Sequence, residues 1–195
     1  MPRTAVKIGP QDHGKTMSLD EFDTADWVEG YRYELGRGII SVTNIPGRPH
    51  VTRYMAVRKQ FVLYEAAHPD EIHTVLGGAE CKVLVAGLES ERHPDLAVYK
   101  KPPPDEELWS TWVPELVIEI VSRGSGERDY IEKREEYLQF GIQEYWIIDA
   151  DKRQMTALRR YRGQWNERII RAPKKYKTPL LPGLEFDCTA VFNAK

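Results

Sequence analysis

A short apolar run with one carboxylate in its middle constrains the fold of this chain more than any other feature. The run is Leu-Val-Ile-Glu-Ile-Val over residues 116–121, and Glu119 is its fourth residue. Apolar runs of this length predict a strand buried inside a sheet. A carboxylate there is costly unless it is paired, protonated or bound to a cation. Glu119 therefore belongs to a site, or it is a core salt-bridge partner or an inward-pointing charge on an edge strand.

The elements around this strand predict a mixed α/β (α+β) fold. Residues 50–67 are expected to form a helix, because Tyr54, Val57, Phe61 and Tyr64 recur at spacings of three and four. The other expected elements are a short helix from Ser18 to Asp26, a hairpin over 31–42, a β region over 73–85, a strand over 95–99, a helix over 128–140 closed by Gly141, a strand over 144–148, and strands near 155–161 and 165–170. This order predicts a mixed central β-sheet flanked by helices, with a C-terminal β-hairpin.

Length and composition indicate one domain. The 195 residues suit a flexible N-terminal segment over 1–16 and a single domain over 17–195. Residues 101–114, which include Pro102-Pro103-Pro104, are expected to be an irregular surface loop. No apolar run approaches the roughly 20 residues of a membrane span, and residues 1–16 hold no secretory signal. Cys81 and Cys188 form no disulfide or zinc pattern, so we expect a cytoplasmic protein.

Positive charge is concentrated near the C-terminus. Between Lys152 and Lys177 there are ten Lys and Arg against one acid, whereas the rest of the chain has 18 basic and 29 acidic residues. Tyr and Trp residues are interleaved with this charge, which favours nucleic acid as a partner. The alternative is a solvated hairpin face on a protein that is acidic elsewhere. The candidate contacts are Arg159, Arg160, Arg162, Lys174 and Lys175.

A second acid is a candidate partner for Glu119. Asp95 follows Pro94 at the start of a short expected strand. If the two acids lie on neighbouring strands, their mutual repulsion invites a divalent cation, and their hard oxygens suit Mg²⁺ or Mn²⁺. Taken alone, Asp95 is equally consistent with a turn acid.

The helix after the Glu119 strand offers a cation. Asp129, Lys133 and Tyr137 are spaced by four and form one stripe. Lys133 would lean over the strand end, where an ammonium offsets charge developing on a phosphate. The alternative is a surface Asp–Lys pair with Tyr137 in the core.

Two further residues are candidates. Glu34 interrupts an apolar pattern and is a candidate extra ligand or orienting carboxylate. His50 lies at the start of an expected helix, where we expect it either to contact a phosphate or to be only a helix cap or a solvated side chain. The chain contains no Walker loop, dinucleotide-binding glycine motif or nucleophile elbow.

An ordered set of segments resembles a known family. In chain order these are Y-R-Y-E-L, His50, H-P-D-L-A-V, E-L-V-I-E-I-V-S, D-Y-I-E-K-R-E-E-Y and G-I-Q-E-Y-W-I-I-D. Together they resemble the Uma-two-type restriction endonucleases, a branch of the PD-(D/E)XK nuclease superfamily, over roughly residues 18–184. The resemblance implies a restriction-endonuclease-like fold with Asp95 and Glu119 as its two acids. The lysine expected two residues after the second acid is absent, because that residue is Val121. The resemblance places this lysine on the following helix, at Lys133.

Two hypotheses follow. The first is a metal-dependent DNA endonuclease in which Asp95, Glu119 and the carbonyl of Ile120 hold Mg²⁺ or Mn²⁺, with Lys133 and Glu34 completing the catalytic group. Cutting both strands would favour a homodimer or a higher homo-oligomer. The second is a catalytically silent nuclease-fold protein that binds nucleic acid or a protein partner. A glycosidase using a carboxylate pair ranks lower, because no aromatic sugar platform lies near these acids.

Overall fold

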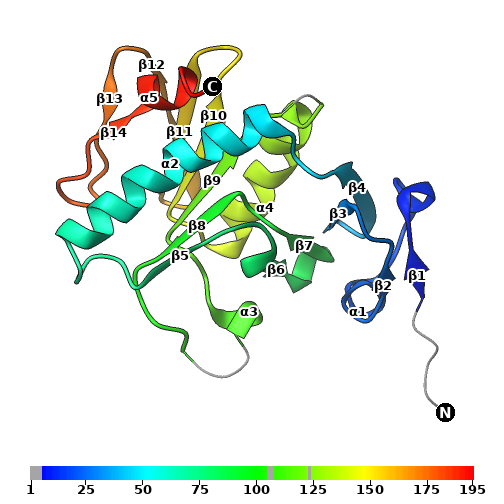
Figure 1. Ribbon diagram of the computed structural model, residues 1–195. Coiled ribbons are helices and arrows are strands. Elements are labelled where there is room, and N and C mark those ends of the chain that lie inside the picture. The colour runs from blue at the N-terminus through cyan, green and yellow to red at the C-terminus, as the bar shows by residue number, and fades with distance from the viewer. Residues whose placement is uncertain (1–5, 105–107, 123) are drawn as a thin grey trace.

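The computed structural model describes residues 6–104, 108–122 and 124–195 (Figure 1). Its centre is a six-stranded sheet. In spatial order the strands are β12 (Gln164–Arg171), β11 (Gln154–Tyr161), β10 (Glu144–Asp149), β9 (Leu116–Ile120), β8 (Leu96–Tyr99) and β5 (Thr74–Leu76). β9 and β10 run parallel, and the other neighbouring pairs are antiparallel. The expected mixed central sheet is therefore confirmed.

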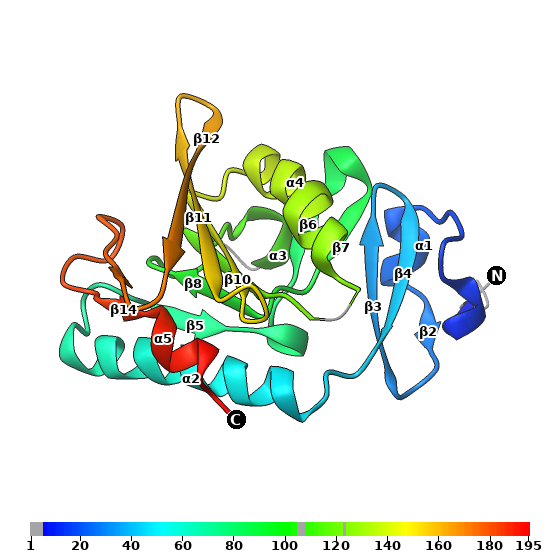
Figure 2. The same cartoon turned by 90° about the horizontal axis from the view of Figure 1, so that it is seen from above.

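Helices cover both faces of this sheet, as Figure 2 shows. On one face lies α2 (Arg48–Ala67), with α5 (Cys188–Phe192) beside it. On the other lie a π-helical turn, η4 (Arg128–Glu132), and α4 (Lys133–Phe140). None of the described helices is long and apolar enough to cross a membrane.

Alternation along β9 decides which way Glu119 points. Leu116, Ile118 and Ile120 pack in the apolar cluster on the α2 face. Val117 packs in the cluster that contains Tyr137 of α4. Since successive strand residues point to opposite faces, Glu119 points to the α4 face with Val117.

A second, four-stranded sheet lies beside the first. In spatial order its strands are β4 (Ile39–Asn44), β3 (Tyr31–Gly36), β7 (Ser90–Arg92) and β6 (Val83–Val85). Its outer face packs on α1 (Leu19–Asp23) and on a parallel pair of short strands, β1 (Lys7–Ile8) and β2 (Asp26–Trp27), through Ile8, Phe22, Leu35 and Ile40. Since β7 leads directly to β8, the two sheets meet where Asp95 lies.

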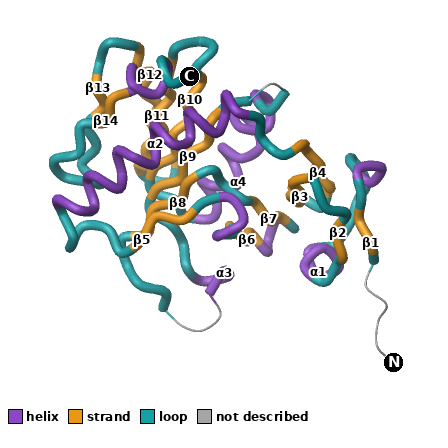
Figure 3. Tube along the Cα trace, viewed as in Figure 1, coloured by secondary structure: helices purple, strands orange, loops and turns teal. Residues whose placement is uncertain are grey.

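The remaining elements are short. They are the 3₁₀ turns η1 (Pro10–Asp12), η2 (Gly78–Glu80) and η3 (Ala86–Leu88), the helix α3 (Leu108–Thr111), and the strands β13 (Lys175–Tyr176) and β14 (Phe186–Asp187) (Figure 3). Both cysteines are buried and free.

Local sequence signals account for several boundaries. Ser18 and Glu21 form the expected capping box at the start of α1. α2 begins at Arg48 rather than His50, because Pro49 is tolerated in the first helical turn. Gly141 has the left-handed conformation that ends α4, with φ of 101°.

Two local expectations were wrong. Within 101–114, expected to be irregular, the short helix α3 forms, and Trp112, just after it, packs on Tyr99 with ring centroids 3.9 Å apart. Residues 105–107 of that stretch lie outside the described residues. Within 1–16, expected to be loose, β1 and η1 form because β1 pairs with β2 and buries Ile8. The division into a segment 1–16 and a domain 17–195 stays a prediction.

Candidate active site

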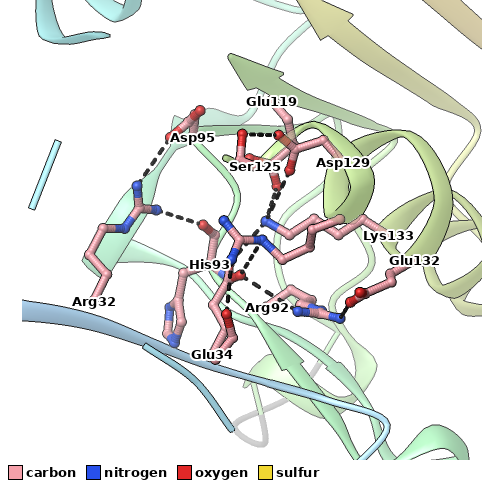
Figure 4. A network of polar contacts seen from close by, with 12 residues as sticks. Arg32, Glu34, Arg92, His93, Asp95, Glu119, Ser125, Asp129, Glu132 and Lys133 are labelled. Atoms are coloured by element: carbon pink, nitrogen blue, oxygen red, sulfur yellow. Dashed lines mark hydrogen bonds and ion pairs between the residues drawn. The ribbon is translucent and has the colours of Figure 1, made fainter. Parts of the chain in front are cut away.

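Asp95 and Glu119 converge at one end of the central sheet (Figure 4). β8 and β9 are antiparallel with Leu96 opposite Ile118, so the residue before β8 lies beside the end of β9. The link is direct, since the N–H of Ile120 donates to Oδ2 of Asp95 at 2.8 Å. Both carboxylates are buried. The expectation that the two acids lie on neighbouring strands is thus met in the geometry.

Lys133 of α4 links the carboxylates of Glu119 and Glu34. Its Nζ donates to Oε1 of Glu119 at 2.8 Å and to Oε1 of Glu34 at 3.0 Å. Asp129, one helical turn earlier, approaches the same ammonium at 3.9 Å. The side chain is 3% exposed. Burial alone would lower the pKa of Lys133, but the three carboxylates raise it above its ordinary value, so the ammonium stays charged.

Glu34 enters the site from the second sheet. Its Oε1 also accepts the backbone N–H of His93 at 3.1 Å. Arg92 and Arg128 approach its Oε2 at 3.6 and 3.7 Å. Burial would raise the pKa of Glu34, but Lys133 and these arginines outweigh it and hold the pKa well below the usual range. Glu34 is therefore a permanent anion.

Asp95 is also held as an anion. Nε2 of His50 lies 3.2 Å from its Oδ1, and a guanidinium nitrogen of Arg32 lies 3.4 Å from the same oxygen. Arg32 also donates to the carbonyl of His93 at 3.0 Å. Burial opposes ionisation, but these two neighbours and the Ile120 N–H lower the pKa of Asp95.

Glu119 differs from Glu34 and Asp95 in that its pKa is raised. It accepts the hydroxyl of Tyr137 at 2.9 Å in addition to Lys133. Burial raises its pKa to about 7 in spite of Lys133, and the nearby charges of Asp95, Asp129 and Glu34 add to the rise. Burial also raises the pKa of Asp129, which accepts the Ser125 hydroxyl at 2.6 Å. Burial, the largest cause of both shifts, therefore makes Glu119 and Asp129 harder to ionise than Glu34 and Asp95.

These groups line one wall of an open cleft of about 800 Å³. Its walls come from both sheets, from the start of α2 and from the loop after β9. Four basic side chains line it besides His50: Arg32, Arg53, Arg128 and Lys133. A polyanion would thus find positive charge around a carboxylate centre.

The carboxylate pair fits a hard divalent cation. Mg²⁺ binds through one or two carboxylates and keeps several waters. Asp95 and Glu119 supply that pair, and Ile120 lines the cleft beside them with its N–H already engaged by Asp95. Within the described ranges no group of three or more His, Cys, Asp or Glu is arranged to hold a metal. A cation here would therefore take its other ligands from the main chain and from water.

The basic residues of the C-terminal region lie elsewhere. Ile120 pairs with Ile148 at the site end of the sheet, whereas Arg159 pairs with Glu144 at the opposite end. Arg159, Arg160 and Arg162 line a separate cavity of about 470 Å³ there. Lys174 follows β12, and Lys175 begins β13, which pairs with β14 in a separate two-stranded sheet. Of the expected nucleic-acid contacts, the structure brings only His50 to the carboxylates.

Three arginines of the site were not anticipated. Arg32 could have been found, because it is two residues from Glu34 on an expected strand and so shares its face. Arg128 and Arg92 follow no periodic pattern. Arg92 is 1% exposed and donates twice to Glu136, at 2.7 and 2.9 Å. A long-range pair of this kind leaves no signal in sequence spacing.

Comparisons with known proteins identify a family and a similar fold. A family model described as "Uma2: Putative restriction endonuclease" matches residues 19–190. A crystal structure titled "a putative nuclease belonging to DUF820", from Anabaena variabilis ATCC 29413, superposes with a TM-score of 0.70. The two chains are 20% identical, and the match covers 90% of this chain and 97% of that one. Because the identity is low, this likeness concerns the fold alone. No curated protein matches this sequence significantly.

Proposed function

This chain belongs to the Uma2 restriction-endonuclease family, whose model spans residues 19–190, and on that premise we propose that it is a metal-dependent DNA endonuclease that hydrolyses phosphodiester bonds. The observation that carries the proposal is the meeting of Asp95 and Glu119 at adjacent strand ends, with Lys133 on Glu119. Nuclease function in general follows from the family. The metal, the DNA substrate and the roles of individual residues are the proposal.

Asp95, Glu119 and the carbonyl of Ile120 would hold Mg²⁺ or Mn²⁺. When bound, such a cation lowers the pKa of a water ligand and polarises the scissile phosphate. The anionic state of Asp95 is secured by His50 and Arg32, so one ligand is ready at neutral pH. Glu119, whose pKa is about 7 without a cation, is the ligand that a cation would help to ionise.

Lys133 acts as a fixed positive charge in this proposal. Its ammonium is held by Glu119 and Glu34, and its pKa is raised, so it is a poor proton acceptor. A preorganised ammonium stabilises the negative charge that develops on phosphate oxygens during attack. Glu34 then positions Lys133 rather than acting on the substrate itself.

The cleft cations supply phosphate contacts. Arg32 and Arg128 line the cleft, and the planar guanidinium group matches phosphate oxygens in two-point contacts. His50, which we expected to contact a phosphate, also orients Asp95 through its Nε2. Cutting both strands of a duplex would need two such sites, so the proposal includes a homodimer or a higher oligomer.

The alternative is a catalytically silent protein that binds nucleic acid or a protein partner through the same fold. One observation favours it: Oε1 of Glu119 is already taken by Lys133 and Tyr137. The two proposals differ in metal binding, because a silent site has no need of a divalent cation.

Nicking of supercoiled plasmid with Mg²⁺ and with Mn²⁺ tests the proposal. The wild type should nick, whereas Asp95→Ala, Glu119→Ala and Lys133→Ala should each slow nicking by more than about 100-fold. Glu135→Ala is the matched control, because Glu135 lies on the same helix but is exposed and, among the described residues, pairs with Arg37 alone. Nicking by Glu119→Ala at the wild-type rate would contradict the proposal. Unchanged nicking by Lys133→Ala alone would remove only the role given to the lysine.

A further inference from the structure

A second cavity lies at the end of the central sheet opposite the carboxylates. It has a volume of about 470 Å³ and is lined by Lys100, Gln143, Glu144, Arg159, Arg160, Arg162, Gly163, Pro179 and Leu180. Arg159 and Glu144 are opposite one another in the β10–β11 pairing, four residues from the level of Ile120. At about 3.3 Å per residue, the cavity begins roughly 13 Å from the carboxylate end. It is therefore separate from the active-site cleft.

Among the described residues, the arginines of this cavity are bound directly by no carboxylate, unlike most arginines near the active-site cleft. Arg32, Arg37, Arg53, Arg92, Arg128 and Arg134 all form ion pairs with carboxylates. In contrast, the side chains of Arg159 and Arg160 form no hydrogen bond or ion pair with any described residue, and Arg162 only lies over the ring of Tyr161. Three arginines thus line one cavity, and no described carboxylate forms an ion pair with any of them.

The single acid of the lining, Glu144, offsets only part of this charge: burial raises its pKa, and the charge of Arg159 opposite it opposes that rise. Glu144 is 1% exposed, and its carboxylate accepts the hydroxyl of Thr178 and the indole N–H of Trp146, both from the interior. Lys100 is likewise engaged, with Glu71 at 3.0 Å and the carbonyl of Leu180 at 2.8 Å. The hydrogen-bond donors of the arginines are therefore the polar groups of this cavity that are available to a ligand.

The turn of the hairpin explains why these side chains gather. Arg162 and Gly163 have φ of 50° and 77°, the pair of positive values that a tight hairpin turn needs. Successive strand residues point to opposite faces, so Arg159 and Arg160 line the cavity from the two faces of β11, and Arg162 lines it from the turn just beyond them. The backbone N–H of Arg160 is fixed to the carbonyl of Gln143 at 2.8 Å, which anchors the turn beside β10.

We propose that this cavity binds a backbone phosphate of nucleic acid, as a second anion site apart from the carboxylate cleft. Guanidinium groups bind phosphate oxygens through two parallel N–H donors. The lining contains no aromatic side chain on which a base would stack, so the cavity suits the phosphate rather than the base. The choice of nucleic acid as the source of the phosphate rests on the proposed function. The same chemistry would also admit free inorganic phosphate.

The test compares two double variants of the full-length protein that remove the same charge from the same hairpin. Arg159→Ala with Arg162→Ala empties the cavity of two donors, whereas Arg168→Ala with Arg171→Ala removes two arginines of β12 outside its lining. Binding of a fluorescent 20-base-pair duplex is measured in EDTA over a range of salt. The cavity variant should bind at least tenfold more weakly and lose about one from the slope of log affinity against log salt, as expected for one phosphate contact. The control variant should change far less.

Equal losses in the two variants would overturn the inference, because they would reflect net charge alone. The free-phosphate arm follows the arginine Nε–H signals by NMR during titration with inorganic phosphate. Suppose that the chemical shifts change only for Arg159, Arg160 and Arg162 and that the cavity variant binds the duplex as well as the wild type does. The ligand of the cavity would then be free phosphate rather than a nucleic-acid phosphate. If the wild type nicks plasmid but the cavity variant binds like the wild type, the inference fails and the proposed function stands. If the cavity variant alone loses affinity and the wild type does not nick plasmid, the inference stands and the proposed function fails.

Discussion

At the scale of single residues, the four buried carboxylates of the site differ in how far neighbouring cations offset the cost of burying their charge, and Lys133 offsets that cost only in part for Glu119. Glu34 and Asp95 are anions stabilised by their own arginines and His50, whereas Glu119 and Asp129 depend on Lys133. A buried carboxylate whose pKa lies near neutrality is a liability for folding. In a metal-binding site it is useful, because the protein keeps a ligand that becomes fully anionic when a cation arrives.

The pKa of Glu119 predicts how stability depends on pH. In the metal-free protein, the folded state holds this proton up to about pH 7, whereas the unfolded chain releases it near the ordinary value of 4.5. The folded state then binds more protons between these values, so the free energy of unfolding falls as pH rises from 5 to 8. Glu34 and Asp95 act at lower pH, because their lowered pKa values withdraw stability only as pH falls through them.

Thermal unfolding in EDTA, measured from pH 5 to pH 8, checks this expectation. Glu119→Gln removes the titrating group and should flatten the fall relative to the wild type. The contribution of histidines cancels in the comparison. Parallel curves for the two proteins would show that Glu119 titrates at its ordinary value.

The hydroxyl of Tyr137 predicts a smaller effect. Tyr137→Phe removes the 2.9 Å donor to Glu119 but keeps the ring that packs edge-on against Tyr145 at 5.0 Å. Leaving a buried carboxylate oxygen with one donor fewer should cost about 1–3 kcal/mol in chemical denaturation. Tyr161→Phe, at an exposed tyrosine, is the matched control and should cost nothing measurable. An equally small change in both variants would mean that water replaces the lost donor.

Gly36 makes room for the buried arginine behind Glu34. A Cβ at this position would lie 2.1 Å from a terminal nitrogen of Arg92. Arg92 cannot move aside, because Glu136 binds it twice in a fully buried pair. Gly36→Ala should therefore lower the free energy of unfolding by about 1–3 kcal/mol. Gly87→Ala, where nothing lies within 4 Å, should be tolerated in the same denaturation experiment. Equal stability of the two variants would contradict the tight packing of Arg92.

At the scale of elements, two apolar faces hold the site in place. α2 packs on the central sheet through Val57, Phe61 and Tyr64, and its first turn carries His50 to Asp95. On the other face, the short connection from β9 to η4 is closed by the Ser125 hydroxyl, which donates to Asp129. η4 and α4 therefore begin close to the end of β9, and Lys133 of α4 lies over Glu119 of β9.

The inner face of α2 should carry most of its stability. Phe61 is fully buried against Trp146 and Phe186, whereas Met55, on the same helix, is 61% exposed. Phe61→Ala should cost about 3–5 kcal/mol because it leaves a cavity. Met55→Ala should change the free energy of unfolding by less than about 0.5 kcal/mol. Urea denaturation measures both, and similar costs would show that α2 is not docked by this face.

The elements also show what the sequence could predict. Alternation and helical spacing identified the sheet, α2, α4 and both hairpins, because each carries an apolar pattern longer than one turn. The carboxylate pair followed from one acid inside a buried run and another at a strand start. β7, β13, β14 and α5 escaped, since two to five residues hold no period. Arg92 and Arg128 escaped because their partners are brought close only by the meeting of two sheets.

At the scale of the whole molecule, the cleft exists because two sheets meet at one corner. The central sheet supplies Asp95 and Glu119, the N-terminal sheet supplies Arg32 and Glu34, and α2 contributes His50. Of the positive region near the C-terminus, Arg159, Arg160 and Arg162 lie at the other end of the central sheet. Charge is thus divided between a mixed cleft with carboxylates at its base and a separate arginine cavity, a division that net charge alone does not reveal.

The most direct test of the central claim is a Mn²⁺ titration followed by electron paramagnetic resonance, with wild type, Asp95→Asn and Glu119→Gln in parallel. We expect the wild type to bind Mn²⁺ at one site per chain and both variants to lose at least tenfold in affinity, since each removes one anionic ligand. Competition by Mg²⁺ should release the bound Mn²⁺. A wild type that binds no Mn²⁺, or variants that bind it as well as the wild type, would contradict the claim that these two carboxylates form a metal site.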